Sequence, residues 1–346
     1  MQYLQNLLRG CGLPAGGLSP LADASDVAEL LLKCPAHAPT PLRDVPALAA
    51  ALGVARISLK DERQRMGLGS FKALGAAHAI AREAAVIGAD DLRQALRGRV
   101  YVTASAGNHG LSVAAGARLF GARAVIYLAE TVPEAFAERL RAKGADVMRA
   151  AADYQASMQA AANVAQARGW TLLSDSSWPG YTELPLRVME GYLQLASEAA
   201  MQIDTPPSHI LLQAGVGGLA AAVATHARRV WGDGPQIIVV EPQAAPALME
   251  GIQAGQVVDT GGPASCMGRL DCKTASMIAL DGLARDADVF VTISEDEAQR
   301  GSDLLIGHGL PTTPSGAAGV AALLAGLDLP AEAHVLGILS EGPEDG

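Results

Sequence analysis

The regular alternation of short β-rich runs with longer helical runs is the feature that most constrains the fold of this chain. Strands are expected at Arg56–Leu59, Arg99–Thr103, Ala124–Tyr127, Asp146–Met148, Thr171–Leu173, His209–Gln213, Gln236–Val240, Asp288–Thr292 and His334–Leu339. Helices are expected between them, at Phe71–Ala85, His109–Phe120, Pro133–Lys143, Tyr154–Arg168, Thr182–Ala199, Gly217–Val230, Ala247–Ala254, Thr274–Leu283, Glu295–Gly307 and Gly316–Gly326. This alternation predicts a doubly wound α/β fold, with sites at the carboxyl ends of parallel strands.

Length and composition favour two domains with large cores. The chain has 346 residues, of which 50% are hydrophobic and 4% aromatic, with 38 glycines. A chain of this length is expected to form two domains. Abundant small residues suit helices that pack closely on a sheet. Loop-like stretches at Ser174–Gly180 and Asp204–Ser208 suggest a break near the middle, and the long loop Asp259–Lys273 is a candidate for function.

Charge and cysteine usage exclude several classes of protein. The formal net charge of −10 argues against nucleic acid or an anionic membrane as a partner. The histidines lack metal-ligand spacing, and the cysteines form no CxxC pair, so we expect no metal site and no disulfide framework. Cys266 and Cys272 are expected to pack in the interior. Met1 to Gly17 lacks signal-peptide features and no apolar stretch is long enough to span a bilayer, so a cytoplasmic protein is expected.

One lysine is placed where Schiff-base chemistry could use it. The run Ser70-Phe71-Lys72 follows a polar, glycine-containing segment and opens an apolar helix. The positive end of the helix dipole is expected to lower the pKa of Lys72, and an easily deprotonated lysine is what a Schiff base requires. Taken alone, Lys72 is better explained as a surface lysine at a helix start, and only two further loops favour the chemical role.

Two further loops join strands to helices in the way that anion sites require. The first contains Thr103 to Gly110, where backbone N–H groups at a helix start could hold a carboxylate and Asn108 could bond a ring hydroxyl. The alternative is that Asn108 is an ordinary N-cap. The second, Gly215 to Leu219, could hold a phosphate. With Ala220 and Glu241 it also fits a dinucleotide fingerprint, although so late a position in the chain is unusual for that motif.

The three segments in this order resemble those of the fold-type II (tryptophan synthase β-like) pyridoxal-phosphate enzymes, which include threonine and serine dehydratases. Thr40-Pro41-Leu42 also resembles an early signature of that family. The resemblance covers about residues 37 to 342. It implies two three-layer α/β domains with mostly parallel sheets and the cofactor in the cleft between them. The implied large domain is 1–97 and 180–346, and the implied small, mobile, substrate-binding domain is 98–179.

Within this superfamily the chain most resembles the diaminopropionate ammonia-lyases. The likeness lies in Lys60-Asp61-Glu62 before the lysine, in Asp175 to Tyr181, and in Ser340-Glu341-Gly342. One position departs from the pattern. Those lyases commonly carry an aspartate in the loop that corresponds to Thr103–Gly110, here called the asparagine loop. This chain has Ala106 at that position, and its loop is similar to that of threonine dehydratases instead.

The resemblance implies a role for each segment. Lys72 would form the Schiff base with pyridoxal 5'-phosphate, and Asn108 would bond the ring oxygen. The phosphate would be held by Gly215, Val216, Gly217, Gly218 and Leu219. The substrate carboxylate would be held by Ala104, Ser105, Ala106, Gly107 and His109. The ring nitrogen would face a neutral hydroxyl, from Ser340 by preference or from Ser315, which favours expulsion of a β substituent over transamination.

The implied reaction is an α,β-elimination. Lys72 would move the α proton, and Asp175 would serve as a second acid or base, unless it merely caps the helix near Thr182. The substrate would be 2,3-diaminopropionate or a related small β-substituted amino acid, giving a 2-oxo acid and ammonia, with L-serine/L-threonine dehydratase as the alternative. A nicotinamide oxidoreductase and a catalytically silent cofactor-binding protein are more distant alternatives. A homodimer is expected.

Overall fold

The computed structural model describes residues 1–14, 16–34, 36–89, 91–152 and 154–343. Its strands are β1 Gln2–Gln5, β2 Leu42–Asp44, β3 Arg56–Asp61, β4 Val100–Ala104, β5 Arg123–Ala129, β6 Ala145–Ala151, β7 Thr171–Leu172, β8 His209–Gln213, β9 Gln236–Pro242, β10 Val289–Ile293 and β11 His334–Leu339. Its α-helices are α1 Ser25–Leu31, α2 Pro46–Ala51, α3 Lys72–Ile87, α4 Asn108–Leu119, α5 Glu134–Ala142, α6 Tyr154–Arg168, α7 Glu183–Gln202, α8 Gly218–Trp231, α9 Ala247–Ala254, α10 Met277–Asp286, α11 Glu295–Gly307 and α12 Pro314–Leu324.

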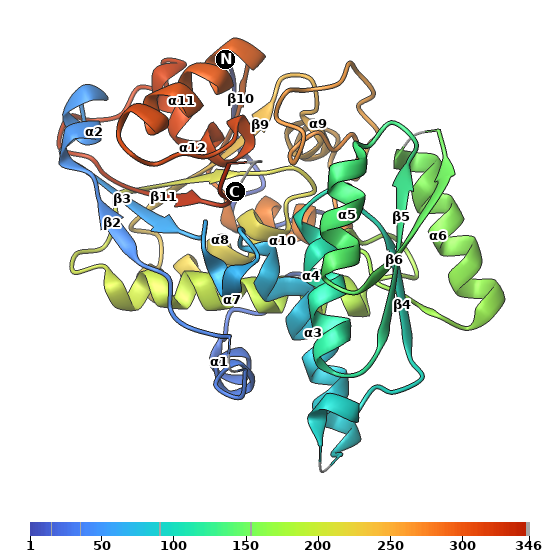
Figure 1. Ribbon diagram of the computed structural model, residues 1–346. Coiled ribbons are helices and arrows are strands. Elements are labelled where there is room, and N and C mark those ends of the chain that lie inside the picture. The colour runs from blue at the N-terminus through green and yellow to red at the C-terminus, as the bar shows by residue number, and fades with distance from the viewer. Residues whose placement is uncertain (15, 35, 90, 153, 344–346) are drawn as a thin grey trace.

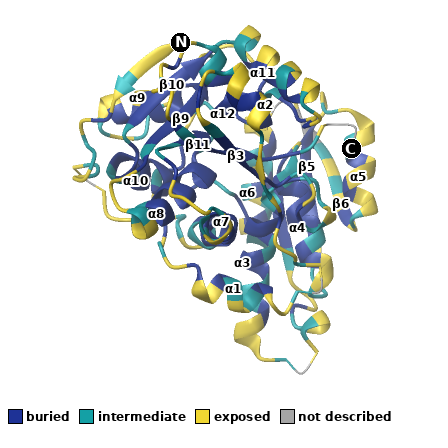
Figure 2. Ribbon diagram, turned by 90° about the vertical axis from the view of Figure 1, so that its left-hand side faces the viewer, coloured by how far each residue is buried: buried dark blue, intermediate teal, exposed yellow. Residues whose placement is uncertain are grey.

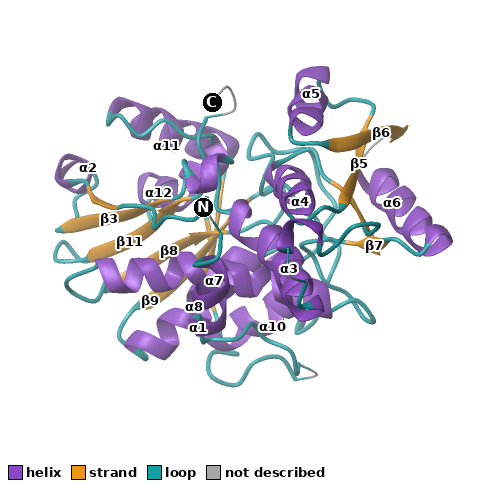
Figure 3. Cartoon of the chain, turned by 60° about the horizontal axis from the view of Figure 1, so that its bottom comes forward, coloured by secondary structure: helices purple, strands orange, loops and turns teal. Residues whose placement is uncertain are grey.

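The strands form two separate sheets, as the alternation predicts. The large sheet has the strand order β1-β10-β9-β8-β11-β3-β2, and the small sheet has the order β6-β5-β4-β7. The small sheet is parallel throughout, and in the large one only β1 and β2 pair antiparallel with their neighbours. Figure 3 shows the two sheets apart, with helices lying between and around them. The predicted fold class is confirmed.

Helices cover the faces of both sheets, which explains why the central strands are apolar along their whole length. In the large sheet α11 and α12 lie on one face, and α7, α8 and α10 lie on the other (Figure 1). Strands buried on both faces read as continuous apolar runs rather than alternating ones. In β10, for instance, every residue is buried, and Figure 2 shows the central strands as the most buried part of the molecule.

Most expected elements are present, and those that were not expected are short or lie at an edge. Two strands and two α-helices are absent from the sequence-based expectation: β1, β2, α1 and α2. The two strands have only four and three residues and are mostly exposed, so they carry no alternation that a sequence would display. Helix α11 begins with the acidic residues Glu295 to Glu297, and Ser294 and Glu297 form a reciprocal capping box.

Helices α3 and α7 cross at two glycines, and this crossing places the start of α3. A Cβ built on Gly191 of α7 would lie 2.3 Å from the Leu74 carbonyl oxygen of α3. A Cβ on Gly75 of α3 would lie 2.5 Å from the ring of Tyr192. The backbones can therefore approach this closely only because both positions lack a side chain.

We predict that Gly191→Ala destabilises the protein by about 2–3 kcal/mol, because the added methyl meets a backbone oxygen that cannot rotate away. Urea unfolding monitored by circular dichroism measures this change. The matched control is Gly307→Ala at the end of α11, where a Cβ meets nothing within 4 Å and stability should be unchanged or slightly raised. Equal stability of the two variants would contradict the tight crossing.

Candidate active site

An ion pair between Lys72 and Asp175 lies at the centre of the site. Lys72 is the first residue of α3, and its Nζ lies 2.5 Å from Oδ2 of Asp175, in the loop after β7. Both side chains are about four-fifths buried, at 19% and 18% exposed. The alternative in which Asp175 only caps a helix is wrong, because Thr182 is the N-cap of α7 and that cap has no side-chain hydrogen bond.

The electrostatics of Lys72 differ from the sequence-based expectation. Burial alone would lower the pKa of Lys72, but the carboxylate of Asp175 outweighs burial and raises it above the usual value. Burial would likewise raise the pKa of Asp175, yet the ammonium of Lys72 holds it well below its usual range. The expectation of a lowered lysine pKa is therefore wrong for the chain without cofactor. The helix dipole is a weaker influence than a carboxylate in contact.

A buried network of charges fixes the segment before Lys72. Arg65 donates to Glu62 and to Glu198, each at 2.7 Å, and Lys60 donates to Glu198 at 2.7 Å. All four side chains are at most 1% exposed. Charges so deeply buried are held in one geometry, because breaking any pair would leave an uncompensated ion. The path of the chain into α3, and with it the position of Lys72, is thereby set.

The asparagine loop joins β4 to α4 and faces the end of β11. Asn108 is the first helical residue, and Gly107 occupies the N-cap, so the reading of Asn108 as a cap is wrong. Its Nδ2 donates instead to Oε2 of Glu341 at 2.5 Å. The Ser105 hydroxyl oxygen accepts from the amides of Gly107 and Gly110, at 3.2 and 3.0 Å. Ser105 therefore shapes the loop with its side chain, while Ala104 and Ala106 offer backbone only.

His109 is buried beside the ion pair with one ring nitrogen unused. Its Nε2 lies 2.9 Å from the Leu173 carbonyl oxygen, which can only accept, so Nε2 carries the proton. Burial lowers the pKa of His109, so the ring is neutral. Among the residues that the structure describes, its Nδ1 has no hydrogen-bond partner. A neutral imidazole with a free lone pair is available to a bound molecule.

The glycine loop between β8 and α8 is built to approach an anion. Gly217 has φ of +95°, a conformation that favours glycine, and α8 begins at Gly218. The first-turn N–H groups of α8 have no acceptor within the helix, and the helix dipole adds positive potential there. Val216 and Leu219 complete the loop, which begins at Gly215 against the side chain of Cys272. Such a loop is suited to a phosphate.

The dinucleotide interpretation of this loop fails at Glu241. The carboxylate of Glu241 is fully buried and accepts from the amides of Leu248 and Met249, at 2.7 and 2.8 Å. It therefore caps the start of α9. Burial raises its pKa to about 8. A side chain used in this way is not available to the ribose of a nucleotide.

The two candidate serines lie at neighbouring segment ends. Ser340 follows β11, and its hydroxyl oxygen accepts from Nε2 of Gln213 at 3.1 Å. Ser315 lies in the first turn of α12, and its hydroxyl oxygen accepts from the amide of Arg269 at 3.1 Å. Both are buried. Ser340 is also tied to the lysine segment, because its carbonyl oxygen accepts from the amide of Phe71 at 3.0 Å.

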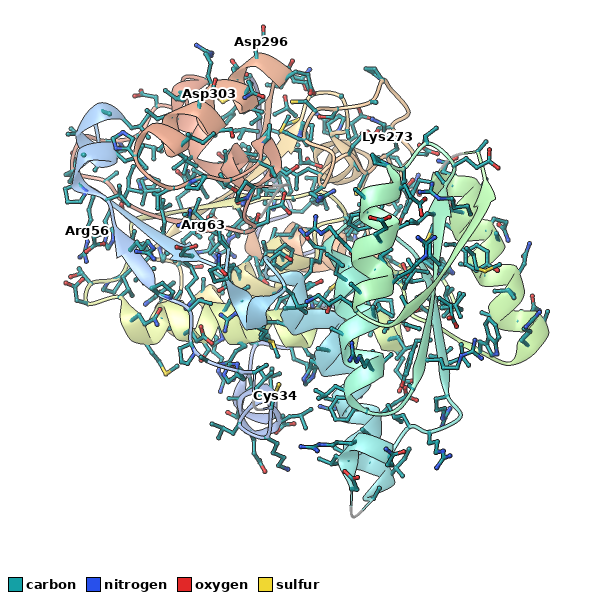
Figure 4. All side chains as sticks on the ribbon, in the orientation of Figure 1. Cys34, Arg56, Arg63, Lys273, Asp296 and Asp303 are labelled. Atoms are coloured by element: carbon teal, nitrogen blue, oxygen red, sulfur yellow. The ribbon has the colours of Figure 1, made fainter. Side chains whose placement is uncertain are left out.

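The long loop 259–273 brings the side chain of Cys272 to the site. Lys273, labelled in Figure 4, anchors the loop by donating to the carbonyl oxygens of Ala244 and Pro263, at 2.8 and 2.7 Å. Cys272 packs beside Gly215, and burial raises the pKa of its thiol to about 12, so the thiol stays protonated. Interior packing of Cys266 was expected and is wrong, because this side chain is exposed.

A cavity of about 300 Å³ opens beside Asn108 and Glu341. Its lining comes from the loop before Lys72, from the long loop, from the chain after β11 and from α4 and α5. Four cationic side chains line it against the single carboxylate of Glu341: Arg63 (labelled in Figure 4), Arg139, Lys143 and Arg269. A positive mouth of this kind attracts a substrate carboxylate.

These residues fit pyridoxal phosphate. Lys72 can meet its aldehyde, the loop 215–219 its phosphate, and Asn108 its ring oxygen. Three buried polar atoms of the site lack a hydrogen-bond partner within the described part of the chain: Ser70 Oγ, His109 Nδ1 and the hydroxyl of Tyr192. Such orphaned groups are rare and cost free energy unless something pairs with them. A polar cofactor and substrate would supply those partners.

Two side chains of the site, Glu341 and Tyr192, were not among the residues expected from the sequence. The carboxylate of Glu341 accepts a hydrogen bond from Asn108, which is 233 positions away in the sequence, and one from Thr313, which is 28 positions away. Each bond is 2.5 Å long. Tyr192 lies under Lys72 because of the glycine crossing of α3 and α7. The only pointer to Glu341 was its place in the segment 340–342, and Tyr192 had none.

Known proteins resemble this chain over most of its length. A family model for pyridoxal-phosphate dependent enzymes matches residues 34–341. The diaminopropionate ammonia-lyase of Salmonella typhimurium is 33% identical over 353 residues, which cover 90% of this chain and 86% of that protein. The L-serine dehydratase/L-threonine deaminase of Mus musculus is 31% identical over 224 residues, which cover 64% of this chain and 62% of that protein.

A solved structure has the same fold as this chain. The Escherichia coli diaminopropionate ammonia lyase, in complex with an aminoacrylate–PLP azomethine reaction intermediate, superposes with a TM-score of 0.87 at 29% identity. The match covers 99% of this chain and 93% of that one. With a family model spanning most of the chain and a relative above 30% identity, the assignment is secure. The chain belongs to the family of pyridoxal-phosphate-dependent enzymes.

Proposed function

We propose that this chain catalyses α,β-elimination of ammonia from 2,3-diaminopropionate, giving a 2-oxo acid and ammonia. The observation that carries the proposal is the Lys72–Asp175 pair, in which Nζ and Oδ2 lie 2.5 Å apart beside a loop suited to a phosphate. An elimination needs one group to remove the α proton and another to serve the leaving group, and this pair supplies both. The identity of 33% with a named diaminopropionate ammonia-lyase supports the substrate.

Each residue has a proposed task in this reaction. Bound pyridoxal phosphate supplies the electron sink that lets bonds at the substrate α carbon break. Lys72 takes the α proton. Because Lys72 keeps Asp175 ionised, the proton for the leaving amine comes from the lysine ammonium and passes along the 2.5 Å contact through Asp175. Asn108 and the loop 215–219 hold the cofactor, and the amides of the asparagine loop hold the substrate carboxylate.

The hydroxyl of Ser340 is proposed to face the ring nitrogen, with Ser315 as the second choice. Ser340 follows β11, and its carbonyl oxygen accepts from the amide of Phe71, next to Lys72. The hydroxyl oxygen of Ser315 instead accepts from the amide of Arg269, in the long loop. A neutral hydroxyl leaves the ring nitrogen unprotonated. That property favours expulsion of a β substituent.

The proposed small domain, residues 98–179, moves against the remainder when substrate binds. The small sheet and its helices lie within this range, and the cavity beside Asn108 is lined from both sides of the division. Movement of α4 and α5 towards the loop before Lys72 would close the cavity around the substrate carboxylate. Closure of this kind excludes water and assembles the site.

The protein is proposed to act as a homodimer in the cytoplasm. Light scattering of the purified protein measures the oligomeric state. Within the described residues, no helix is both long enough and apolar enough to cross a bilayer.

Ala106 favours a second candidate, L-serine/L-threonine dehydratase, and predicts a single enantiomer. A carboxylate at that position could pair with a second ammonium and could remove an α proton from the face opposite Lys72; alanine can do neither. We predict that L-diaminopropionate is turned over and that the D form reacts at least about a hundredfold more slowly, the scale of one missing general base.

Ammonia release from D- and L-diaminopropionate, L-serine and L-threonine tests this prediction. The matched variant is Ala106→Asp, which restores a carboxylate to the loop and should raise the rate with the D form. Equal rates of the wild-type protein on both enantiomers would refute the stereochemical argument. Preference for serine or threonine over diaminopropionate would make the dehydratase the correct assignment.

A further inference from the structure

Tyr192 carries a buried hydroxyl that makes no hydrogen bond of normal length within the described residues and interacts electrostatically with Lys72. The residue lies on α7 and is 1% exposed, and its hydroxyl has no hydrogen-bond partner among the described residues. An unpaired buried hydroxyl is costly, whereas phenylalanine would fill the same space at no such cost. The oxygen therefore needs an explanation beyond packing.

The surroundings of Tyr192 belong to the active site. Nζ of Lys72 lies 5.6 Å from the centre of its ring, and the ring of Phe71 packs edge-on with centroids 4.9 Å apart. A Cβ on Gly75 would lie 2.8 Å from the hydroxyl oxygen itself. Lys72 and Gly75 are three positions apart, on one side of α3. The hydroxyl thus points to the side of α3 that carries the lysine.

The ring also borders the proposed phosphate loop. A Cβ on Gly218, the first residue of α8, would lie 3.6 Å from Cε2 of Tyr192. The side chain is consequently enclosed between the start of α3 and the start of α8. Burial raises the pKa of Tyr192 to about 12, with the Lys72 ammonium acting against the rise. The phenol is therefore protonated at neutral pH and can donate as well as accept.

A group that both donates and accepts complements Asp175. A carboxylate can accept from the lysine ammonium but offers nothing to the lone pair of a neutral amine. Lys72 must pass between these two states while it moves the α proton. On this basis, and resting on the proposed function, we propose that Tyr192 is a positioning residue for Lys72. Its hydroxyl donates to Nζ when the amine is neutral and accepts from Nζ when it is charged.

The test compares Tyr192→Phe with the wild-type holoenzyme and with Tyr101→Phe. Tyr101 is an equally buried tyrosine whose hydroxyl donates to Glu83, outside the site, so its variant controls for loss of a buried hydroxyl. The first readout is independent of any substrate: the cofactor is removed, and the rate at which added pyridoxal phosphate becomes linked to Lys72 is followed by absorbance. The second is kcat, KM and the isotope effect with α-deuterated substrate.

For Tyr192→Phe we expect linkage of the cofactor to slow about tenfold, the scale of one hydrogen bond to the attacking nitrogen. We also expect kcat to fall about tenfold with KM within a factor of two, and the isotope effect to rise, because removal of the α proton becomes more limiting. Tyr101→Phe should match the wild type in all of these. The melting temperature of Tyr192→Phe without cofactor should be unchanged or higher, since an unpaired group has been removed.

Two results would overturn the proposal. One is a Tyr192→Phe enzyme with wild-type linkage rate and kcat. The other is an unchanged linkage rate with weaker retention of the cofactor, which would assign the hydroxyl to the phosphate instead. Because linkage needs no amino acid, absence of diaminopropionate turnover in the wild type would refute the proposed function while leaving this readout intact.

Discussion

Replacing Lys72 by alanine is expected to lower turnover by at least about a thousandfold while the protein stays folded. The variant loses both the point of attachment for the cofactor and the group that moves the α proton, and general base catalysis alone contributes roughly 10²–10⁴. The side chain is 19% exposed and lies at a helix start, so the hydrophobic core is not disturbed. The measurement is ammonia release at saturating L-diaminopropionate, with circular dichroism to verify folding.

A matched control for this prediction is Lys33→Ala, at an exposed position after α1, which should keep wild-type activity. The Lys72→Ala protein should still bind cofactor through the loop 215–219, without a covalent link. Wild-type-like turnover by Lys72→Ala would end the Schiff-base account.

Asp175→Asn is expected to lower kcat on L-diaminopropionate by about 10²–10⁴, with a smaller effect on KM. Asparagine has nearly the same shape but cannot carry the proton from Lys72 to the leaving amine. Loss of the carboxylate also removes the group that raises the pKa of Lys72, so burial would then lower that pKa. Both effects act on proton transfer, so the expected loss falls mainly on kcat.

Asp303→Asn on α11 is the control for Asp175→Asn, because Asp303 (labelled in Figure 4) is exposed and, within the described part of the chain, accepts from Gln299 far from the site. It should leave kcat unchanged. Retention of full diaminopropionate turnover in Asp175→Asn would remove Asp175 from the mechanism. Efficient serine turnover that Asp175→Asn leaves untouched would instead support the dehydratase assignment.

The parts of the fold that the sequence predicts are those buried on both faces. Strands β8 and β11 were expected with the bounds that the structure has, because an uninterrupted apolar run between turn residues allows few other readings. The edge strands β1 and β2 were not expected. They are short and mostly exposed, so their pairing is decided by the neighbouring strands rather than by their own residues.

The site was predictable where its residues are contiguous in sequence and not where distant segments meet. The position of Lys72 at a helix start follows from local sequence, but the sign of its pKa shift depends on Asp175, which is 103 residues away. The residues next to Lys72 indicate only the effect of the helix dipole, which predicts a lowered pKa where the structure has a raised one. Tyr192 illustrates the same limit, since its place beside Lys72 results from the crossing at Gly191 and Gly75.

The most direct test of the central claim is to locate the covalent bond between protein and cofactor. The purified protein, supplied with pyridoxal phosphate, is reduced with borohydride, digested and analysed by mass spectrometry. The account predicts a yellow protein that bleaches on reduction and a single phosphopyridoxyl group on the peptide containing Lys72. A colourless protein that takes up no cofactor, or a modification on another lysine with Lys72 unmodified, would contradict it.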